Sequence, residues 1–189
     1  PLEDKVITVA RAQRTYTFPA NFILIGSMNP CPCGNFGSQL ECRCTPMQIN
    51  KYLNRISGPL LDRMDLHVEL PRVNFEQLKD HNPGKTSAQI KEKVTAARAI
   101  QENRFVDRNY KVNALMDSHD VKRYCSLNRD AEQLLKSAFQ KLNLSARGYN
   151  RILKVARTIA DLENEAVVQT QHLAEALQYR SLDKKYWMV

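Results

Sequence analysis

Four of the five cysteines of this 189-residue chain lie within the segment NPCPCGNFGSQLECRC, residues 29–44. They form two Cys-x-Cys pairs, Cys31/Cys33 and Cys42/Cys44. Four thiolates satisfy a tetrahedral zinc ion, and two glycines between the pairs let the chain turn back. We therefore predict structural zinc here. Free or partly disulfide-linked thiols, or another metal or redox role, stay open because a one-residue gap differs from the common C-x2-C spacing.

The composition is that of a soluble globular protein with a basic surface. Hydrophobic residues make up 43% of the chain, charged residues 25%, and the net charge is +8. No apolar run approaches the roughly 20 residues that span a bilayer, and no signal peptide is visible. We expect a cytoplasmic protein with no membrane partner. The charge permits binding to a polyanion without establishing it.

Residues 1–72 show a mixed strand and helix pattern. We expect strands at 5–9, 15–18, 21–28 and 65–70, and helices at 46–56 and 59–64. The first two strands predict a hairpin around a polar, basic tip. NFILIGSM, 21–28, is typical of a central strand buried on both faces. Thr45 followed by Pro46 is a helix start, with Thr as the cap.

The rest of the chain is predicted to be helical. We expect helices at 87–105, with Ser87 as its cap, at 117–124 and at 129–142. Ser145 is expected to cap the next helix, which buries Tyr149. Thr170 is expected to cap a last helix that runs to about residue 179. The fold class is thus α/β followed by all-α, with domains at 1–72 and 87–189 and a linker at 73–86. GKTS at 84–87 is part of this linker, because no strand precedes it and position 79 is Lys, so a phosphate loop is not formed.

Three polar residues occupy positions suited to phosphate chemistry. Asn29 follows the expected central strand, at the sheet edge where ligands of α/β folds bind. Arg63 either forms a surface ion pair with Asp62 or Asp65, or is presented to a neighbour's phosphate. Arg147 lies in the first turn of its helix, where a cation costs a few tenths of a kcal/mol unless an anion binds there too.

Several long stretches of the sequence are similar to those of a known protein family. Together they extend over nearly the whole chain, and the similarity is weakest at residues 73–128. They are PLEDKVITVAR, TFPANFILIGSMNPCPCG, CRCTPMQINKYLNRISGPLLDRMDLHVELPRV and LSARGYNRILKVARTIADLENE with HLAEALQYR. In these stretches the chain resembles the carboxyl-terminal part of bacterial magnesium-chelatase-like AAA+ ATPases of the ComM/YifB type. The resemblance implies the end of an AAA+ αβα core followed by a helical lid domain.

The resemblance also implies residue roles. Asn29 falls at sensor 1, Arg63 at the arginine finger that acts on the adjacent subunit's ATP, and Arg147 at sensor 2. The 5–18 hairpin corresponds to the pre-sensor-1 hairpin, so Arg11 and Arg14 are candidates for contact with the DNA backbone. Whether Arg151 or Arg157 assists Arg147 is left open by the sequence.

The function that the resemblance implies is that of a homohexameric ring that uses ATP and Mg²⁺ to act on DNA, in branch migration during recombination of incoming DNA. The alternatives are a magnesium-chelatase-type motor subunit that remodels a partner protein, and a non-enzymatic zinc-bearing nucleic-acid-binding module. No G-x-x-x-x-G-K-[ST] loop and no apolar strand ending in Asp-Glu occurs in the sequence. We therefore expect a fragment of a longer protein, inactive towards ATP by itself.

Overall fold

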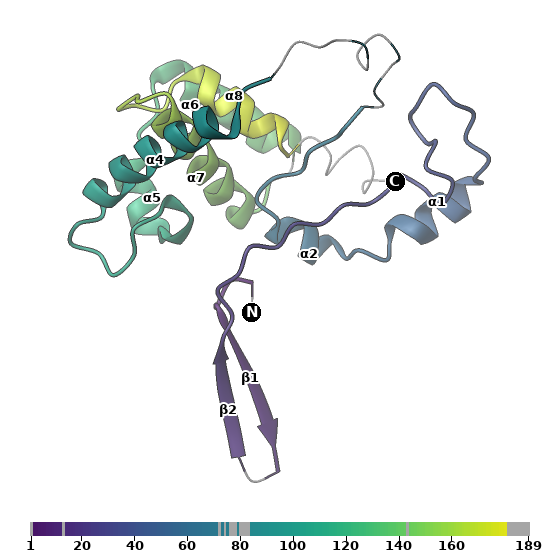
Figure 1. Cartoon of the computed structure of the whole chain (residues 1–189), viewed down its shortest axis with the longest axis horizontal. Helices are drawn as coiled ribbons and strands as arrows, with labels where there is room; N and C mark the ends of the chain where they lie inside the picture. Colours follow the sequence, from purple (N-terminus) through teal and green to yellow (C-terminus); the bar gives the residue numbers. More distant parts are fainter. Residues whose placement is uncertain are drawn as a thin grey trace. The chain divides into compact units, whose positions relative to one another are not determined.

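The computed structural model (Figure 1) describes residues 2–12, 14–71, 73, 75, 79, 84–142 and 144–180. Its contacts divide the chain into two compact units, one that ends at Met64 and one that begins at Asp65. Much of the predicted linker at 73–86 lies outside the described residues. Asn29 and Arg63 thus belong to the first unit and Arg147 to the second.

A β-hairpin opens the first unit and confirms the prediction for that region. Strand β1, Val6–Arg11, pairs antiparallel with β2, Arg14–Pro19. The two strands are rich in β-branched and aromatic residues, which favour a pleated conformation. Every residue in them is exposed, so the hairpin is a two-stranded ribbon without a covered face among the described residues (Figure 1).

The strand predicted at 21–28 is not formed. A strand needs neighbours for its backbone hydrogen bonds, and the hairpin is the one sheet in the described part of the chain. The apolar side chains of the segment are consequently exposed: Phe22, Ile23, Leu24, Ile25 and Met28. The apolar pattern is typical of a buried strand, but no described residue supplies the pairing that a strand requires.

The prediction of a strand at 65–70 is also wrong. Residues of this segment bond to helices of the second unit instead of to a sheet. The Arg151 guanidinium donates to the Asp65 carboxylate at 2.6 Å, and the His67 N–H donates to the Tyr179 carbonyl at 2.8 Å. The described residues therefore contain a small two-stranded sheet and several helices, an arrangement consistent with the end of an AAA+ core and a helical part.

Two short helices complete the first unit, α1 at Pro46–Leu53 and α2 at Gly58–Arg63. The predicted start of α1 is confirmed. Thr45 Oγ1 accepts a hydrogen bond from the Gln48 N–H at 3.3 Å, and the Gln48 side chain accepts one from the Thr45 N–H at 2.9 Å, which is a capping box. Ser57 caps α2 by accepting a hydrogen bond from the Leu60 N–H at 3.3 Å. The helix α1 ends earlier than predicted, at Leu53 and not near 56.

Helices make up the second unit. Those whose bounds the structure describes are α4 (Ser87–Arg104), α5 (Ser118–Tyr124), α6 (Arg129–Leu142), α7 (Ala146–Leu162) and α8 (Thr170–Gln178), with a 3-10 turn η1 at Asn113–Leu115. Helix α7 packs against α4, α5, α8 and η1 and supplies much of the core. Its apolar residues recur at helical spacing, which is why Ile152, Leu153, Ala156 and Ile159 are buried together.

The helix starts are predicted to within one residue. Ser145 caps α7 as expected, accepting from the Gly148 N–H at 2.9 Å. The caps of α4 and α8 are Thr86 and Gln169, each one residue before the predicted Ser87 and Thr170. In α4 the reason is a capping box that the neighbouring threonine forms with a glutamine side chain three residues on.

One residue of α7 departs from the predicted core. Tyr149 is 36% exposed, and its ring meets Phe139 of α6 edge to face, with centroids 6.1 Å apart. Phe139 is itself exposed. The pair lies at the ends of two helices, where fewer neighbours cover a side chain, so Tyr149 makes a surface contact and does not enter the core.

A buried histidine links α8 to the end of α7. His172 Nδ1 accepts from the Gln169 N–H at 3.0 Å, so Nε2 carries the proton of the neutral ring and donates to the Glu163 carboxylate at 2.8 Å. Hydrogen bonds from His172 and then Gln171 hold the pKa of Glu163 below its usual value. A carboxyl group with a lowered folded-state pKa stabilises the fold above its unfolded pKa, and that contribution is lost as the pH falls through the folded pKa.

We expect the free energy of unfolding to fall more steeply between about pH 5 and pH 3 in the wild type than in Glu163→Gln. The difference should be below about 1 kcal/mol, because the carboxylate is 47% exposed and solvent screens it. Urea unfolding followed by circular dichroism at a series of pH values measures it. Glu132→Gln, on the exposed side of α6, is the matched control and should keep the wild-type pH dependence. If the free energy of unfolding falls equally steeply with pH in the wild type and in Glu163→Gln, the hydrogen bond from His172 to Glu163 does not stabilise the fold.

Candidate functional site

The four clustered cysteines bring their sulfur atoms together. Cys31 is buried, Cys42 and Cys44 are half-buried and Cys33 is exposed. The sulfur of Cys31 lies 3.4 Å from that of Cys33 and 3.7 Å from that of Cys42, and all four sulfurs lie within 4.8 Å of one another. A tetrahedral zinc ion with Zn–S bonds of about 2.3 Å needs sulfurs about 3.8 Å apart. The arrangement therefore fits zinc, and these separations exceed the roughly 2.05 Å of a disulfide.

Backbone turns in the loop place the sulfurs. Gly34 and Gly37 have φ angles of +78° and +76°, a region that favours glycine, so the chain turns back after the first pair. The Gly34 N–H donates to the Cys31 carbonyl at 3.0 Å, and the Phe36 N–H donates to the Cys31 sulfur at 3.3 Å. The Asn35 side chain closes the loop by donating to the Glu41 carbonyl at 3.2 Å.

The thiols of the cluster influence one another's ionisation. Backbone N–H groups of Asn35 and then Arg43 lower the pKa of Cys33 to about 6. A backbone hydrogen bond from Cys33 lowers the pKa of Cys44, but burial and the neighbouring sulfurs outweigh it and raise the value to about 12. The four sulfurs resist ionising together, as close like charges do. A divalent cation would remove that repulsion, so the donor set suits a metal. Cys125 is a separate case: burial raises its pKa to about 12.

Asn29 directly precedes the cysteine loop. It is exposed and, in the described structure, does not end a strand. A Cβ atom on Gly34 would lie 3.7 Å from the carbon and the nitrogen of the Asn29 amide. The amide thus lies against the turn that carries the cysteines, and the loop's rigidity bears directly on its position. Its role as sensor 1 stays a prediction.

Arg63 ends helix α2 and is about one-third exposed. Its Nη1 donates to the Pro59 carbonyl one turn earlier, at 2.8 Å, and its Nε lies 3.4 Å from the Glu3 carboxylate. Glu3 was not predicted as a partner, because the two residues are far apart along the chain. Asp65, one of the two predicted partners, is bonded to Arg151.

Arg147 is the second residue of α7 and is exposed. The position confirms the prediction that it lies in the first turn of a helix capped by Ser145. In α7, every residue of which is described, the first turn contains no acidic side chain. A cation therefore lies at the positive end of the helix dipole next to N–H groups, an arrangement that an anion would stabilise.

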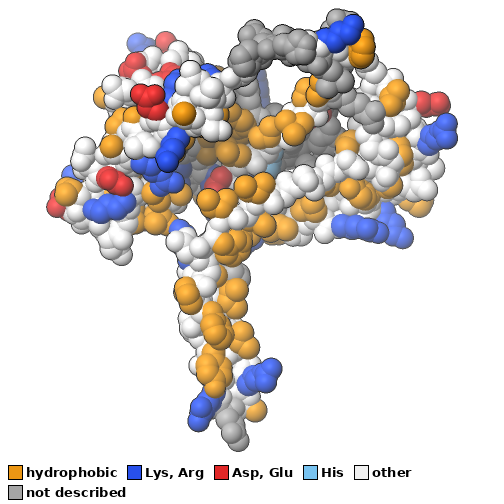
Figure 2. Space-filling model, in the orientation of Figure 1, with side chains coloured by type: hydrophobic (Ala, Val, Ile, Leu, Met, Phe, Trp, Pro, Cys, Tyr) orange, Lys and Arg blue, Asp and Glu red, His pale blue; other side chains and the backbone are white. Residues whose placement is uncertain are grey.

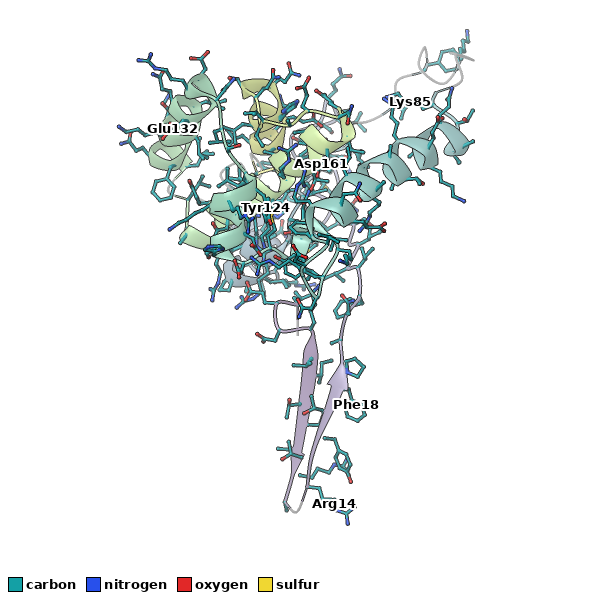
Figure 3. The ribbon with its side chains drawn as sticks, turned by 90° about the vertical axis from the view of Figure 1, so that its left-hand side faces the viewer. Arg14, Phe18, Lys85, Tyr124, Glu132 and Asp161 are labelled. Atoms are coloured by element: carbon teal, nitrogen blue, oxygen red, sulfur yellow. The ribbon has the colours of Figure 1, made fainter. Side chains whose placement is uncertain are left out.

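The two other arginines of α7 have partners within the second unit. Arg151 is held by Asp65 at 2.6 Å. Arg157 is 1% exposed; its Nε donates to Asp161 at 3.1 Å and its Nη1 to the Ala166 carbonyl at 2.7 Å. Asp161, which Figure 3 labels among the helices, also pairs with Arg104. Arg157 is thus committed to a buried network, which excludes it as a surface ligand for phosphate.

Arg11 and Arg14 flank the hairpin tip and form its last cross-strand pair. Both are exposed. Figure 2 shows blue basic side chains at the tip and orange hydrophobic side chains along the strands. Among the described residues, none of the helices combines the length and apolar character that crossing a bilayer requires.

Comparison with known proteins places these features in one family. Residues 84–180 match the family described as magnesium chelatase, subunit ChlI C-terminal, and residues 1–78 match magnesium chelatase, subunit ChlI. Competence protein ComM of Haemophilus influenzae is 45% identical over 183 residues, which are 96% of this chain and 35% of that protein. Uncharacterized protein YifB of Escherichia coli is 42% identical over 185 residues, 97% of this chain and 36% of that protein.

An uncharacterized protein of Mycobacterium tuberculosis is 33% identical over 180 residues, 95% of this chain and 35% of that protein. The chain spans about a third of the length of these relatives. The family match covers more than half of the chain and includes helices α4 to α8. The chain therefore belongs to the magnesium chelatase ChlI family and is a ComM/YifB-type member of it.

Proposed function

We propose that this chain is the nucleotide-sensing part of a ring-forming AAA+ ATPase that acts on DNA in the bacterial cytoplasm. Membership of the magnesium chelatase ChlI family supports an ATP-dependent motor. The observation that carries the proposal is the exposed Arg147 in the first turn of α7, beside the capped helix N-terminus. A guanidinium and helix N–H groups together form a site for one phosphate.

Each of the three residues has a separate task towards ATP. Arg147 binds a phosphate oxygen, and Asn29 orients the attacking water through its amide. Arg63 neutralises the charge that develops on the phosphate of the adjacent subunit, as a trans-acting arginine does. ATP itself supplies the phosphoryl group that is transferred to water.

The remaining parts of the site are assigned to the full-length protein, by which we mean a protein of the relatives' length that contains this chain. The sequence offers no phosphate-binding loop and no strand ending in Asp-Glu. We place the phosphate cradle and the Mg²⁺ ligands in the two-thirds of the relatives' length that this chain does not span. The 189-residue chain alone should therefore not hydrolyse ATP.

The cysteine cluster is proposed to hold one structural zinc ion. Cys31, Cys33, Cys42 and Cys44 form the donor set. The loop follows Asn29 directly, and its turn lies against the Asn29 amide. A fixed loop would keep that amide in position, which a residue acting on a phosphate requires.

DNA is the proposed substrate, in branch migration during recombination of incoming DNA. Support comes from the basic tip of the hairpin, the net charge of +8 and similarity to a protein named for competence. A magnesium-chelatase-type motor that remodels a partner protein is the second candidate, and the family match favours it. A zinc-bearing nucleic-acid-binding module without enzymatic activity is the third.

ATP hydrolysis by the full-length protein is expected to rise when branched DNA is added. DNA bound by the ring would favour the arrangement of subunits in which Arg63 of one subunit reaches the ATP site of its neighbour. Steady-state hydrolysis with and without a four-way junction measures the effect. Hydrolysis indifferent to DNA would support the partner-remodelling motor instead. DNA binding that falls steeply with salt, without hydrolysis, would support the non-enzymatic module.

A further inference from the structure

The two faces of the hairpin differ in chemistry. Successive side chains of a strand point to opposite sides, so cross-strand pairs alternate between the faces. One face carries Thr8 opposite Thr17, with hydroxyl oxygens 3.4 Å apart, between two pairs of small or aliphatic residues. The other, hereafter the aromatic face, carries the pairs Ile7–Phe18, Val9–Tyr16 and Arg11–Arg14. The basic tip and both aromatic rings thus share one face.

The arginine pair is unfavourable without a ligand. Arg11 and Arg14 stand directly opposite each other, where Cβ atoms lie about 4.5–5.5 Å apart and like charges repel. The hairpin segment, residues 6–19, contains no Asp or Glu to compensate. An anion held between the two guanidiniums would remove the repulsion. The tip is therefore suited to a phosphate of a polyanion.

The aromatic rings continue the row that the tip begins. Tyr16 is 48% exposed and Phe18 is 53% exposed. Arg14, Tyr16 and Phe18 occupy alternate positions of β2, so neighbours in the row are about 6.8 Å apart. Figure 3 shows Arg14 at the tip and Phe18 further along the strand. Two large rings on one open face are more than the scattered apolar residues that surfaces normally carry.

A cation followed by aromatic rings matches the chemistry of an unpaired nucleic-acid strand. Guanidiniums bind backbone phosphates, and exposed rings stack with bases irrespective of sequence. Bases of a duplex are paired and stacked on one another, so their flat faces are not available to Tyr16 or Phe18. An acidic peptide would use the arginines and leave the rings without a matching partner.

We propose that the aromatic face binds single-stranded DNA, with unpaired bases stacked on Tyr16 and Phe18 and backbone phosphates held by Arg11 and Arg14. This inference rests on the proposed action on DNA and narrows it to an unpaired strand. The hairpin then distinguishes single strands from duplex by stacking, while its arginines bind either.

The test compares binding of three probes to the full-length protein: a short oligothymidylate, an abasic strand of the same length and a duplex of the same length. Fluorescence anisotropy at several salt concentrations gives Kd and its salt dependence. We expect the oligothymidylate to bind about tenfold or more tightly than the abasic strand, as stacking contributes. Tyr16→Val, which keeps a β-branched residue in the strand but lacks the ring, should lose most of this difference.

Further variants separate stacking from charge. Tyr16→Phe should retain the preference for the oligothymidylate. Arg14→Ala should weaken binding of every probe and reduce the single-strand salt slope by about 0.7, whereas Tyr16→Val should leave that slope unchanged. Thr15→Ala, next to Tyr16 on the opposite face, is the matched control and should bind like the wild type.

Other outcomes would overturn the inference in distinguishable ways. If Tyr16→Val binds oligothymidylate like the wild type while Arg14→Ala binds it weakly, DNA is bound but stacking is wrong. If the wild type binds none of the probes, the proposed action on DNA fails as well. If Tyr16→Val loses oligomeric state in analytical ultracentrifugation, the aromatic face is a protein contact and not a DNA site.

Discussion

Replacing Arg63 with Ala in the full-length protein is expected to lower kcat for ATP hydrolysis about a thousandfold or more, in line with arginines that act on a neighbouring subunit's phosphate. ATP affinity should change little, because the guanidinium acts on charge that develops in the transition state. Steady-state kinetics and nucleotide binding measure the two quantities separately. Arg63→Lys should restore only part of the rate, since Lys lacks the planar fork that binds two phosphate oxygens.

The surroundings of Arg63 are compatible with such a role. One end of the guanidinium is anchored to the Pro59 carbonyl, and the other faces the Glu3 carboxylate at 3.4 Å. With both side chains about one-third exposed, an ion pair of this kind contributes less than about 1 kcal/mol. A phosphate could therefore replace Glu3 at small cost. Glu3→Gln is the matched control, because it removes the ion pair and leaves the arginine in place, and it should keep the wild-type rate.

Mixing subunits tests whether the arginine acts in trans. Arg63→Ala subunits added to wild-type protein should reduce hydrolysis by more than dilution predicts, because each inactivates a neighbour's otherwise complete site. Normal ring assembly of the variant must be shown by ultracentrifugation. A variant that assembles and retains a kcat near that of the wild type would refute the assignment of Arg63.

The helices could be predicted from the sequence because their interactions are local. Helix α6 was predicted with its observed limits, 129–142, since its apolar residues recur at a 3.6-residue period. The cap of α4 was predicted one residue too late, at Ser87, where the structure has Thr86. There the choice depends on the Gln89 side chain, which completes a capping box with the threonine.

Non-local pairing accounts for the errors. Residues 21–28 have the composition of a buried strand, but a strand forms only beside another strand, and the sequence of one segment does not supply it. Arg63–Glu3 and Arg151–Asp65 are equally non-local. In a chain with 28 basic and 20 acidic residues, many such pairs are possible, so composition and spacing do not select these two.

The cysteine cluster could be predicted because its ligands lie close together in the sequence. Its details could not: the sequence does not show that Cys31 alone of the four is fully buried, or that the Asn29 amide lies against Gly34. Both depend on the left-handed turns at Gly34 and Gly37. Those turns connect the proposed zinc site to the predicted sensor residue, so the two can be tested together.

Full-length protein purified without chelators is expected to contain about one equivalent of zinc, bound with the large free energy of structural zinc sites. Cys31→Ser should abolish zinc binding, because the Cys31 sulfur is buried and lies within 3.7 Å of the sulfurs of both Cys33 and Cys42. Elemental analysis measures the metal. Cys125→Ala is the matched control: this cysteine is also buried but belongs to the second unit, so the variant should retain its zinc.

Chelation should also change the reactivity of the thiols and the rate of ATP hydrolysis. Removing zinc should expose Cys33, Cys42 and Cys44 to alkylation, detected by mass spectrometry, while Cys125 stays protected by burial. Hydrolysis should fall at the same time, because a loosened turn at Gly34 no longer holds the Asn29 amide. Less than about a tenth of an equivalent of zinc would contradict the metal site itself. Full loss of zinc with an unchanged rate of ATP hydrolysis would instead show that the loop does not position Asn29. The proposed zinc site would then stand without a role for zinc in the action of Asn29.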